Sequence, residues 1–74
     1  MEKKYINAIN DIQNIIINYE LTESDKQLIV NYMKENNFNS VTEFYCSISD
    51  FTQYHDKNRK DYLVIPRIGV IIFK

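Results

Sequence analysis

Two apolar runs at the C-terminal end constrain the fold of this chain more than any other feature. Residues 62–65 read Tyr-Leu-Val-Ile, residues 70–73 read Val-Ile-Ile-Phe, and Pro-Arg-Ile-Gly lies between them. β-Branched and aromatic residues favour extended backbone, and a short segment with Pro and Gly favours a tight turn. The pattern predicts an antiparallel β-hairpin with a four-residue turn.

Both arms of this hairpin are apolar at almost every position instead of alternating with polar residues. Such strands are either covered on both faces or meet a partner. Because the final run is followed only by Lys74, we expect residues 70–73 to form an edge strand, unless the N-terminal segment covers it. An uncovered apolar edge predicts dimerisation or strand addition to another chain.

The N-terminal segment predicts an amphipathic helix that begins near Glu2. Its apolar residues follow helical spacing at Tyr5, Ala8, Ile9, Ile12, Ile16 and Tyr19. From Asn14 the residues also alternate, and the three consecutive isoleucines 15–17 favour a strand over residues 15–21. The helix therefore either ends near Asn14, with a short strand after it, or continues to Tyr19.

Two further helices are predicted from capping signals. Thr22 and Asp25 are close to a capping box, and Asn36-Asn37 is suited to end the first of these helices in a left-handed conformation. Ser40-Val41-Thr42-Glu43 is a full capping box, so the next helix is expected from Ser40 to His55. The buried residues expected for the two helices are Leu28, Ile29, Tyr32 and Met33, and then Val41, Phe44, Tyr45, Ile48 and Phe51.

The whole chain of 74 residues is expected to form one domain. It contains a single Gly and a single Pro, so most of it should be regular structure, with a charged loop at residues 56–61. The predicted class is α+β, with two or three helices packed on a small antiparallel sheet that includes the C-terminal hairpin.

The predicted order of helix, short strand, helix, helix and hairpin resembles a winged-helix domain. The segments Ile15–Leu21, Thr22–Asn36 and Ser40-Val41-Thr42-Glu43-Phe44 also resemble the strand and two helices of ribbon-helix-helix proteins. Either resemblance implies a dimeric DNA-binding regulator. The residues that would contact DNA are Asn39, Ser40, Thr42, Lys57, Arg59, Lys60 and Arg67.

The charge is unevenly distributed along the chain. Residues 1–54 carry four lysines and eight acidic residues, whereas residues 55–74 carry five basic and two acidic residues. Any attraction to phosphate should therefore reside in the C-terminal quarter. There, Tyr54 and Tyr62 flank the basic loop, a mixture of aromatic and cationic residues typical of binding surfaces.

The residues that support catalysis or hold cofactors are sparse. His55 is the only histidine and Cys46 the only cysteine, and we expect a plain surface role for the first and a half-buried, inert thiol for the second. The carboxylates form no motif, and one glycine cannot make a phosphate-binding loop. We expect no catalytic site, metal or cofactor. The single cysteine and the lack of a long apolar stretch favour the cytoplasm and no membrane contact.

Two functional hypotheses follow from these patterns. The first is a non-enzymatic module that binds another protein, as an inhibitor or accessory factor of the phage or mobile-element type. Its predicted contact residues are Tyr54, Lys57, Arg59, Tyr62, Arg67, Val70 and Ile72. The second is the dimeric DNA-binding regulator. A homodimer fits either hypothesis.

Overall fold

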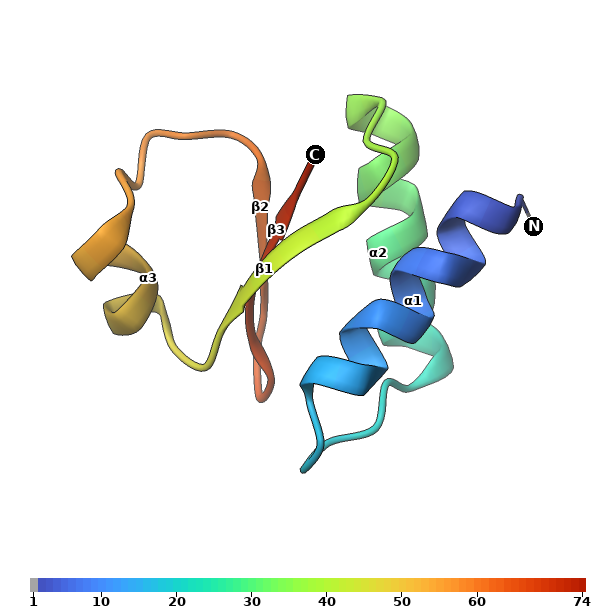
Figure 1. The fold of residues 1–74 in the computed structure, drawn as a ribbon, viewed down its shortest axis with the longest axis horizontal. Coiled ribbons are helices and arrows are strands. Elements are labelled where there is room, and N and C mark those ends of the chain that lie inside the picture. Colours follow the sequence, from blue (N-terminus) through green and yellow to red (C-terminus); the bar gives the residue numbers. More distant parts are fainter. Residues whose placement is uncertain (1) are drawn as a thin grey trace.

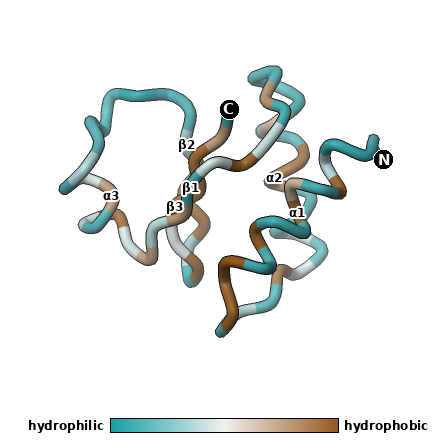
Figure 2. Tube along the Cα trace, viewed as in Figure 1, coloured by the Kyte–Doolittle hydropathy of each residue, from teal (hydrophilic) through white to brown (hydrophobic). Residues whose placement is uncertain are grey.

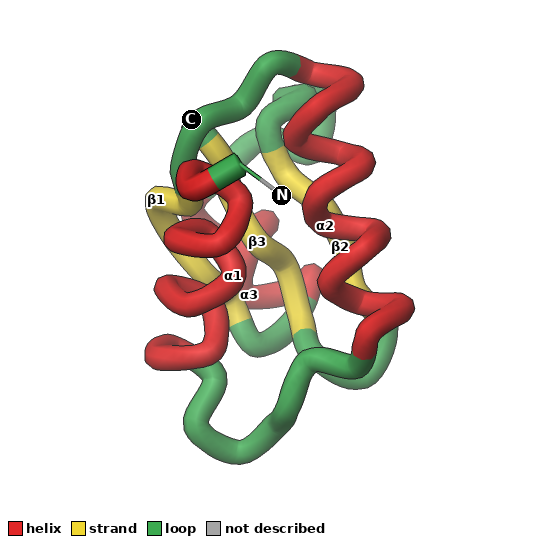
Figure 3. The backbone as a smooth tube through the Cα atoms, turned by 90° about the vertical axis from the view of Figure 1, so that its right-hand side faces the viewer, coloured by secondary structure: helices red, strands yellow, loops and turns green. Residues whose placement is uncertain are grey.

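The computed structural model describes residues 2–74 and contains three helices and one three-stranded antiparallel sheet. The elements in chain order are α1 (Lys3–Ile15), α2 (Glu23–Asn36), β1 (Val41–Tyr45), α3 (Ile48–Tyr54), β2 (Tyr62–Ile65) and β3 (Gly69–Phe73). Helices α1 and α2 lie side by side on one face of the sheet, and the short α3 lies on the other (Figures 1 and 3). The predicted α+β class with a C-terminal hairpin is confirmed.

Helix α1 begins where the sequence predicted and ends at Ile15. The short strand expected after it does not form, and a loop leads to Thr22. Within this loop Ile16 is 4% exposed, whereas Ile17 is 90% exposed. The predicted alternation, which left Ile16 out of the pattern, is not the pattern of burial, because Ile16 is buried while Ile15, Ile17 and Tyr19 are exposed. A β-strand also needs a neighbouring strand, and the sheet provides none at this place.

Helix α2 is defined by the capping signals read from the sequence. The Thr22 hydroxyl accepts from the Asp25 backbone N–H at 3.1 Å, and the Thr22 N–H donates to Asp25 Oδ2 at 3.1 Å. Asn37 ends the helix in the left-handed conformation with φ 59°. The predicted buried face is correct for Ile29 and Met33, but Leu28 remains 43% exposed.

The helix predicted from Ser40 to His55 is wrong in its first half. Residues 41–45 form strand β1, which pairs with β3 through Phe44↔Ile71 and Tyr45↔Val70. Helix α3 starts only at Ile48, where the Ser47 hydroxyl accepts from the Asp50 N–H. The capping box at Ser40 does not start a helix, because extended backbone here pairs with β3, with one irregularity between Val41 and Glu43, and packs its side chains on the sheet.

The C-terminal hairpin forms as predicted, with Ile65 opposite Gly69, but β3 is not an edge strand. The strand order is β1-β3-β2, so β3 is the central strand and all five of its residues are buried. Val70 and Ile72 are 0% and 2% exposed, which excludes both as partner contacts in the folded chain. The expectation of an open apolar edge at residues 70–73 was wrong, because a segment predicted to be helical pairs with it.

Strand β3 divides the hydrophobic core into two parts. Ile71 and Phe73 face α1 and α2, within a large cluster that also contains Ile12, Ile29 and Met33. Val70 and Ile72 form a smaller cluster on the other face with Phe51 of α3, and Tyr45 and Tyr62 pack against it. Because the central strand is covered on both faces, its sequence is apolar throughout rather than alternating.

Candidate functional site

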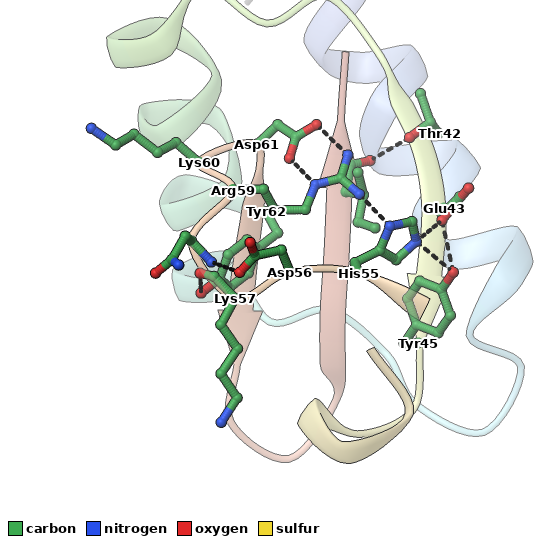
Figure 4. A network of polar contacts seen from close by, with 12 residues as sticks. Thr42, Glu43, Tyr45, His55, Asp56, Lys57, Arg59, Lys60, Asp61 and Tyr62 are labelled. Atoms are coloured by element: carbon green, nitrogen blue, oxygen red, sulfur yellow. Dashed lines mark hydrogen bonds and ion pairs between the residues drawn. The ribbon is translucent and has the colours of Figure 1, made fainter. Parts of the chain in front are cut away.

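A chain of polar contacts joins β1, the end of α3 and the α3–β2 loop (Figure 4). His55 Nε2 lies 3.0 Å from Glu43 Oε2 and 2.8 Å from the Tyr45 hydroxyl, which itself donates to Glu43 at 2.9 Å. On the other side of the ring, Arg59 Nη1 lies 2.5 Å from His55 Nδ1. Arg59 also binds Asp61 through two hydrogen bonds, of 2.5 and 2.6 Å.

The contacts determine which groups donate. A guanidinium only donates, so His55 Nδ1 accepts from Arg59 and the ring hydrogen of neutral His55 lies on Nε2, toward Glu43. The hydrogen bond from the Tyr45 hydroxyl holds the pKa of Glu43 below its usual value, and the same bond raises the pKa of Tyr45. The hydrogen bonds from Arg59 likewise lower the pKa of Asp61.

This network connects the α3–β2 loop to the sheet, and its side chains already bind one another. Both nitrogens of His55 already have partners, and the Arg59 guanidinium is bound to a carboxylate. His55 is therefore not the plain surface residue that we expected. Within residues 2–74, no group of three or more His, Cys, Asp or Glu side chains is arranged to hold a metal ion.

The residues predicted around the basic loop have different roles in the structure. Tyr62 packs its ring on Phe51 at 4.5 Å and donates its hydroxyl to the Lys57 carbonyl oxygen, so it is structural. Tyr54 is 71% exposed and stacks on Tyr45. The side chains of Lys57 and Lys60 extend away from the network (Figure 4).

The remaining predicted residues do not join this loop. Arg67 lies in the β2–β3 turn, at the other end of β2 from Lys57 and Lys60 (Figure 1). Asn39 and Ser40 donate their backbone N–H groups to the Lys74 carbonyl oxygen, and the Thr42 hydroxyl donates to that of Ile72. Neither predicted set of contact residues therefore forms one continuous surface.

The structure instead shows a groove of about 400 Å³ at the end of the domain that carries the β2–β3 turn. One wall is the α1–α2 loop, residues 15–19. The opposite wall consists of Phe44 and Cys46 from the end of β1, together with Arg67 and Ile68 from the hairpin turn. We call this feature the end groove. It brings together three loops that are distant in the sequence.

The rim of the end groove is unusually apolar for an exposed surface. Ile17 is 90% exposed, and its neighbours Ile15 and Tyr19 are 45% and 53% exposed. Figure 2 shows the apolar colour continuing from the end of α1 into the loop. Cys46 is also exposed, which corrects the half-buried thiol expected from the sequence, and Tyr19 is not the core residue that helical spacing suggested.

Arg67 is held in an unfavourable backbone conformation at the edge of this groove. The Ile68 N–H donates to the Ile65 carbonyl oxygen at 3.1 Å, Pro66 follows Ile65, and Arg67 has φ 76°. This is a type II turn, in which the third position normally carries Gly or Asn because φ is positive. A long, branched-headed side chain there is an outlier of the kind that occurs at binding and catalytic sites.

Asp25 fixes the Arg67 side chain from one side. Arg67 Nη2 lies 3.3 Å from Asp25 Oδ1 and 3.2 Å from Oδ2, while the Arg67 side chain stays 62% exposed. The Asp25 carboxylate also accepts from the Thr22 backbone N–H, and this bond is the main cause of its lowered pKa. The cap of α2 therefore orients a guanidinium whose Nε and Nη1 have no hydrogen-bond acceptor among the described residues.

The sequence contains the residues of this site, but it gives no sign that they form one site. The three isoleucines at the end of α1 and the Pro-Arg pair in the turn are both visible in the sequence, but nothing in the sequence places them opposite each other. Only the packing of α1 and α2 on the sheet does so.

Within residues 2–74, no helix has the length and apolar composition needed to cross a membrane. Comparisons of the chain with family models, curated proteins and solved structures give no match.

Proposed function

We propose that this chain is a non-enzymatic module that binds another protein through the end groove. The observation that carries the proposal is Ile17, an isoleucine that is 90% exposed in a segment that also exposes Ile15 and Tyr19. Burying one such side chain contributes about 1.5–3 kcal/mol to association. A surface that keeps several of them beside a groove is typical of a docking site.

The polar network is the second support for the proposal. Its members bind one another, so the residue types that perform acid–base chemistry in other proteins hold the α3–β2 loop here. The proposal includes a location in the cytoplasm, where an exposed thiol such as that of Cys46 stays reduced. It also includes a role as an inhibitor or accessory factor of the protein that is bound.

Site-specific photocrosslinking in the producing cell tests the proposal. A p-benzoylphenylalanine at position 17 is expected to form a single protein adduct on irradiation. The same group at position 28 is the control, because Leu28 is an apolar residue on α2 that is 43% exposed and does not line the end groove. Adducts of equal yield from both positions, or none from position 17, would contradict docking at the end groove.

DNA binding of the winged-helix or ribbon-helix-helix type is the competing proposal. It is favoured by the exposed ammonium groups of Lys57 and Lys60 on one loop. It predicts that duplex DNA is retarded at low salt and that Lys57→Glu with Lys60→Glu weakens this retardation for all sequences. Duplex binding without an adduct from position 17 would favour this proposal over protein docking.

A further inference from the structure

We infer that the segment recognised by the end groove is an apolar peptide stretch of the partner that carries a carboxylate, and that Arg67 receives this carboxylate. The inference rests on the proposed function and adds the chemistry of the partner. It is carried by the placement of one oriented cation at the edge of an otherwise uncharged groove.

The lining of the end groove carries one charged side chain. Its lining residues are Ile15, Ile16, Ile17, Asn18, Tyr19, Phe44, Cys46, Arg67 and Ile68, so Arg67 is the only Lys, Arg, Asp or Glu among them. Apolar side chains of a partner would meet the isoleucines, and a negative group would meet the guanidinium. Asp25, which pairs with Arg67, is not among the lining residues, so a lysine or arginine entering the groove would lose water beside the guanidinium without meeting a carboxylate, which is unfavourable.

Asp25 fixes the orientation of the Arg67 guanidinium. Within residues 2–74, Asp25 is the only residue whose side chain accepts hydrogen bonds from Arg67, and both bonds come from Nη2. Nε and Nη1 therefore retain donors for a further acceptor. A guanidinium held in this way loses little side-chain entropy on binding and offers the paired donors that suit a carboxylate.

The backbone conformation of Arg67, with its positive φ, is unfavourable for an arginine. Glycine would satisfy the turn without strain, and asparagine would do so at lower cost than arginine. Within residues 2–74, the Arg67 side chain forms one ion pair, which is partly exposed and stabilises the fold by less than about 1 kcal/mol. The side chain is thus better explained by a contact outside the chain than by stability.

The experiment is a selection of peptides from a random peptide library displayed on phage, carried out with the full chain. Three baits are compared: the wild type, Arg67→Gln and Ile17→Asp. The wild type is expected to enrich peptides that combine large apolar residues with Asp or Glu. Arg67→Gln should still enrich apolar peptides but without the acidic residue, and Ile17→Asp should enrich neither.

One enriched peptide is then synthesised with its acidic residue and with the corresponding amide. We expect the acidic peptide to bind the wild type at least about tenfold more tightly, because a hydrogen-bonded charge is worth more than a neutral donor–acceptor pair. Arg67→Gln should remove this preference. Arg67→Lys, which keeps the charge but not the paired donors, should retain only part of it.

The outcomes separate the two proposals. Equal affinity for the acidic and amide peptides, with binding still lost in Ile17→Asp, would overturn the role of Arg67 and leave the docking proposal intact. No Ile17-dependent enrichment with any bait would overturn both. A molar mass in solution that rises with concentration and falls in Ile17→Asp would identify a second copy of this chain as the occupant, and would overturn the peptide assignment.

Discussion

Arg67 and Asp25 are 42 positions apart in the sequence, yet the Arg67 guanidinium contacts both oxygens of the Asp25 carboxylate, at 3.2 and 3.3 Å. This contact joins the tip of the β2–β3 hairpin to the N-terminal cap of α2. It therefore links the stability of the helix to the orientation of the one cation that lines the end groove.

The backbone strain at Arg67 can be measured with two variants. Arg67→Gln and Arg67→Gly both remove the ion pair, but only glycine also relieves the positive φ. The free energy of unfolding of Arg67→Gly is therefore expected to exceed that of Arg67→Gln by about 1 kcal/mol. Urea denaturation measures the difference. Identical midpoints for the two variants would show that the turn holds no strain.

The capping box at Asp25 should give a pH-dependent stability. The pKa of Asp25 is lowered in the folded chain, so the unfolded chain binds the proton more readily. The stabilisation by Asp25 is complete above its unfolded pKa, near the ordinary aspartate value of 3.8, and is lost as the pH falls through the lower folded pKa. Asp25→Asn should cost about 1 kcal/mol near neutral pH and progressively less in acid.

The control for this series is Asp11→Asn, which changes an exposed carboxylate on α1. Because this carboxylate caps no helix and is exposed, the variant should leave the free energy of unfolding near neutral pH close to that of the wild type. An Asp25→Asn deficit that persists unchanged in acid would show that the cap depends on shape rather than on charge.

Gly69 should not tolerate a side chain. Its φ is 145°, and a Cβ there would overlap the carbonyl oxygen of Tyr45 and touch the ring of Phe44 at 3.0 Å. Gly69→Ala is expected to destabilise the domain by about 2 kcal/mol or more, since neither β1 nor β3 can move without breaking the ladder. In contrast, Asn37→Gly, at the left-handed C-cap of α2, should leave the melting temperature equal or slightly raised.

Phe51 should anchor α3 to the sheet. It is fully buried in the smaller cluster with Val70 and Ile72. Phe51→Ala is expected to cost about 3–5 kcal/mol, whereas Ile48→Ala on the same helix should cost under about 1 kcal/mol because Ile48 is 42% exposed. Chemical denaturation of the two variants gives both values. A similar cost for each would mean that α3 is held by its ends rather than by Phe51.

The polar network should be visible in a titration of the tyrosines. The hydrogen bond and charge of Glu43 raise the pKa of Tyr45, so Glu43→Gln should let one of the six tyrosines ionise at a lower pH. Burial raises the pKa of Tyr32 independently, and that residue should be unaffected. Absorbance near the phenolate band follows the change. An unchanged alkaline titration would show that Tyr45 and Glu43 are not bonded in solution.

The predictions from the sequence that were wrong have one physical cause in common. Ser40 carries a capping box, yet its segment becomes β1, because local capping contributes about 1 kcal/mol while pairing with β3 buries Phe44 and Val41 on the larger core. The three isoleucines 15–17 favour a strand, yet Ile15 ends α1 and the residues after it form a loop, because no strand lies beside them. In both places the deciding contact is with a residue far along the chain.

The sequence by itself determined the elements whose cause is local. These are the start of α1, the capping box and left-handed end of α2, the charged loop before β2, and the hairpin around Pro66. Tertiary structure alone decided which strand is central, because hydrogen-bonded pairing between β1 and β3 depends on residues about 30 positions apart. It also decided where the exposed apolar surface lies, since strand β3, which was expected to be an open edge, is buried and the loop at Ile17 is not.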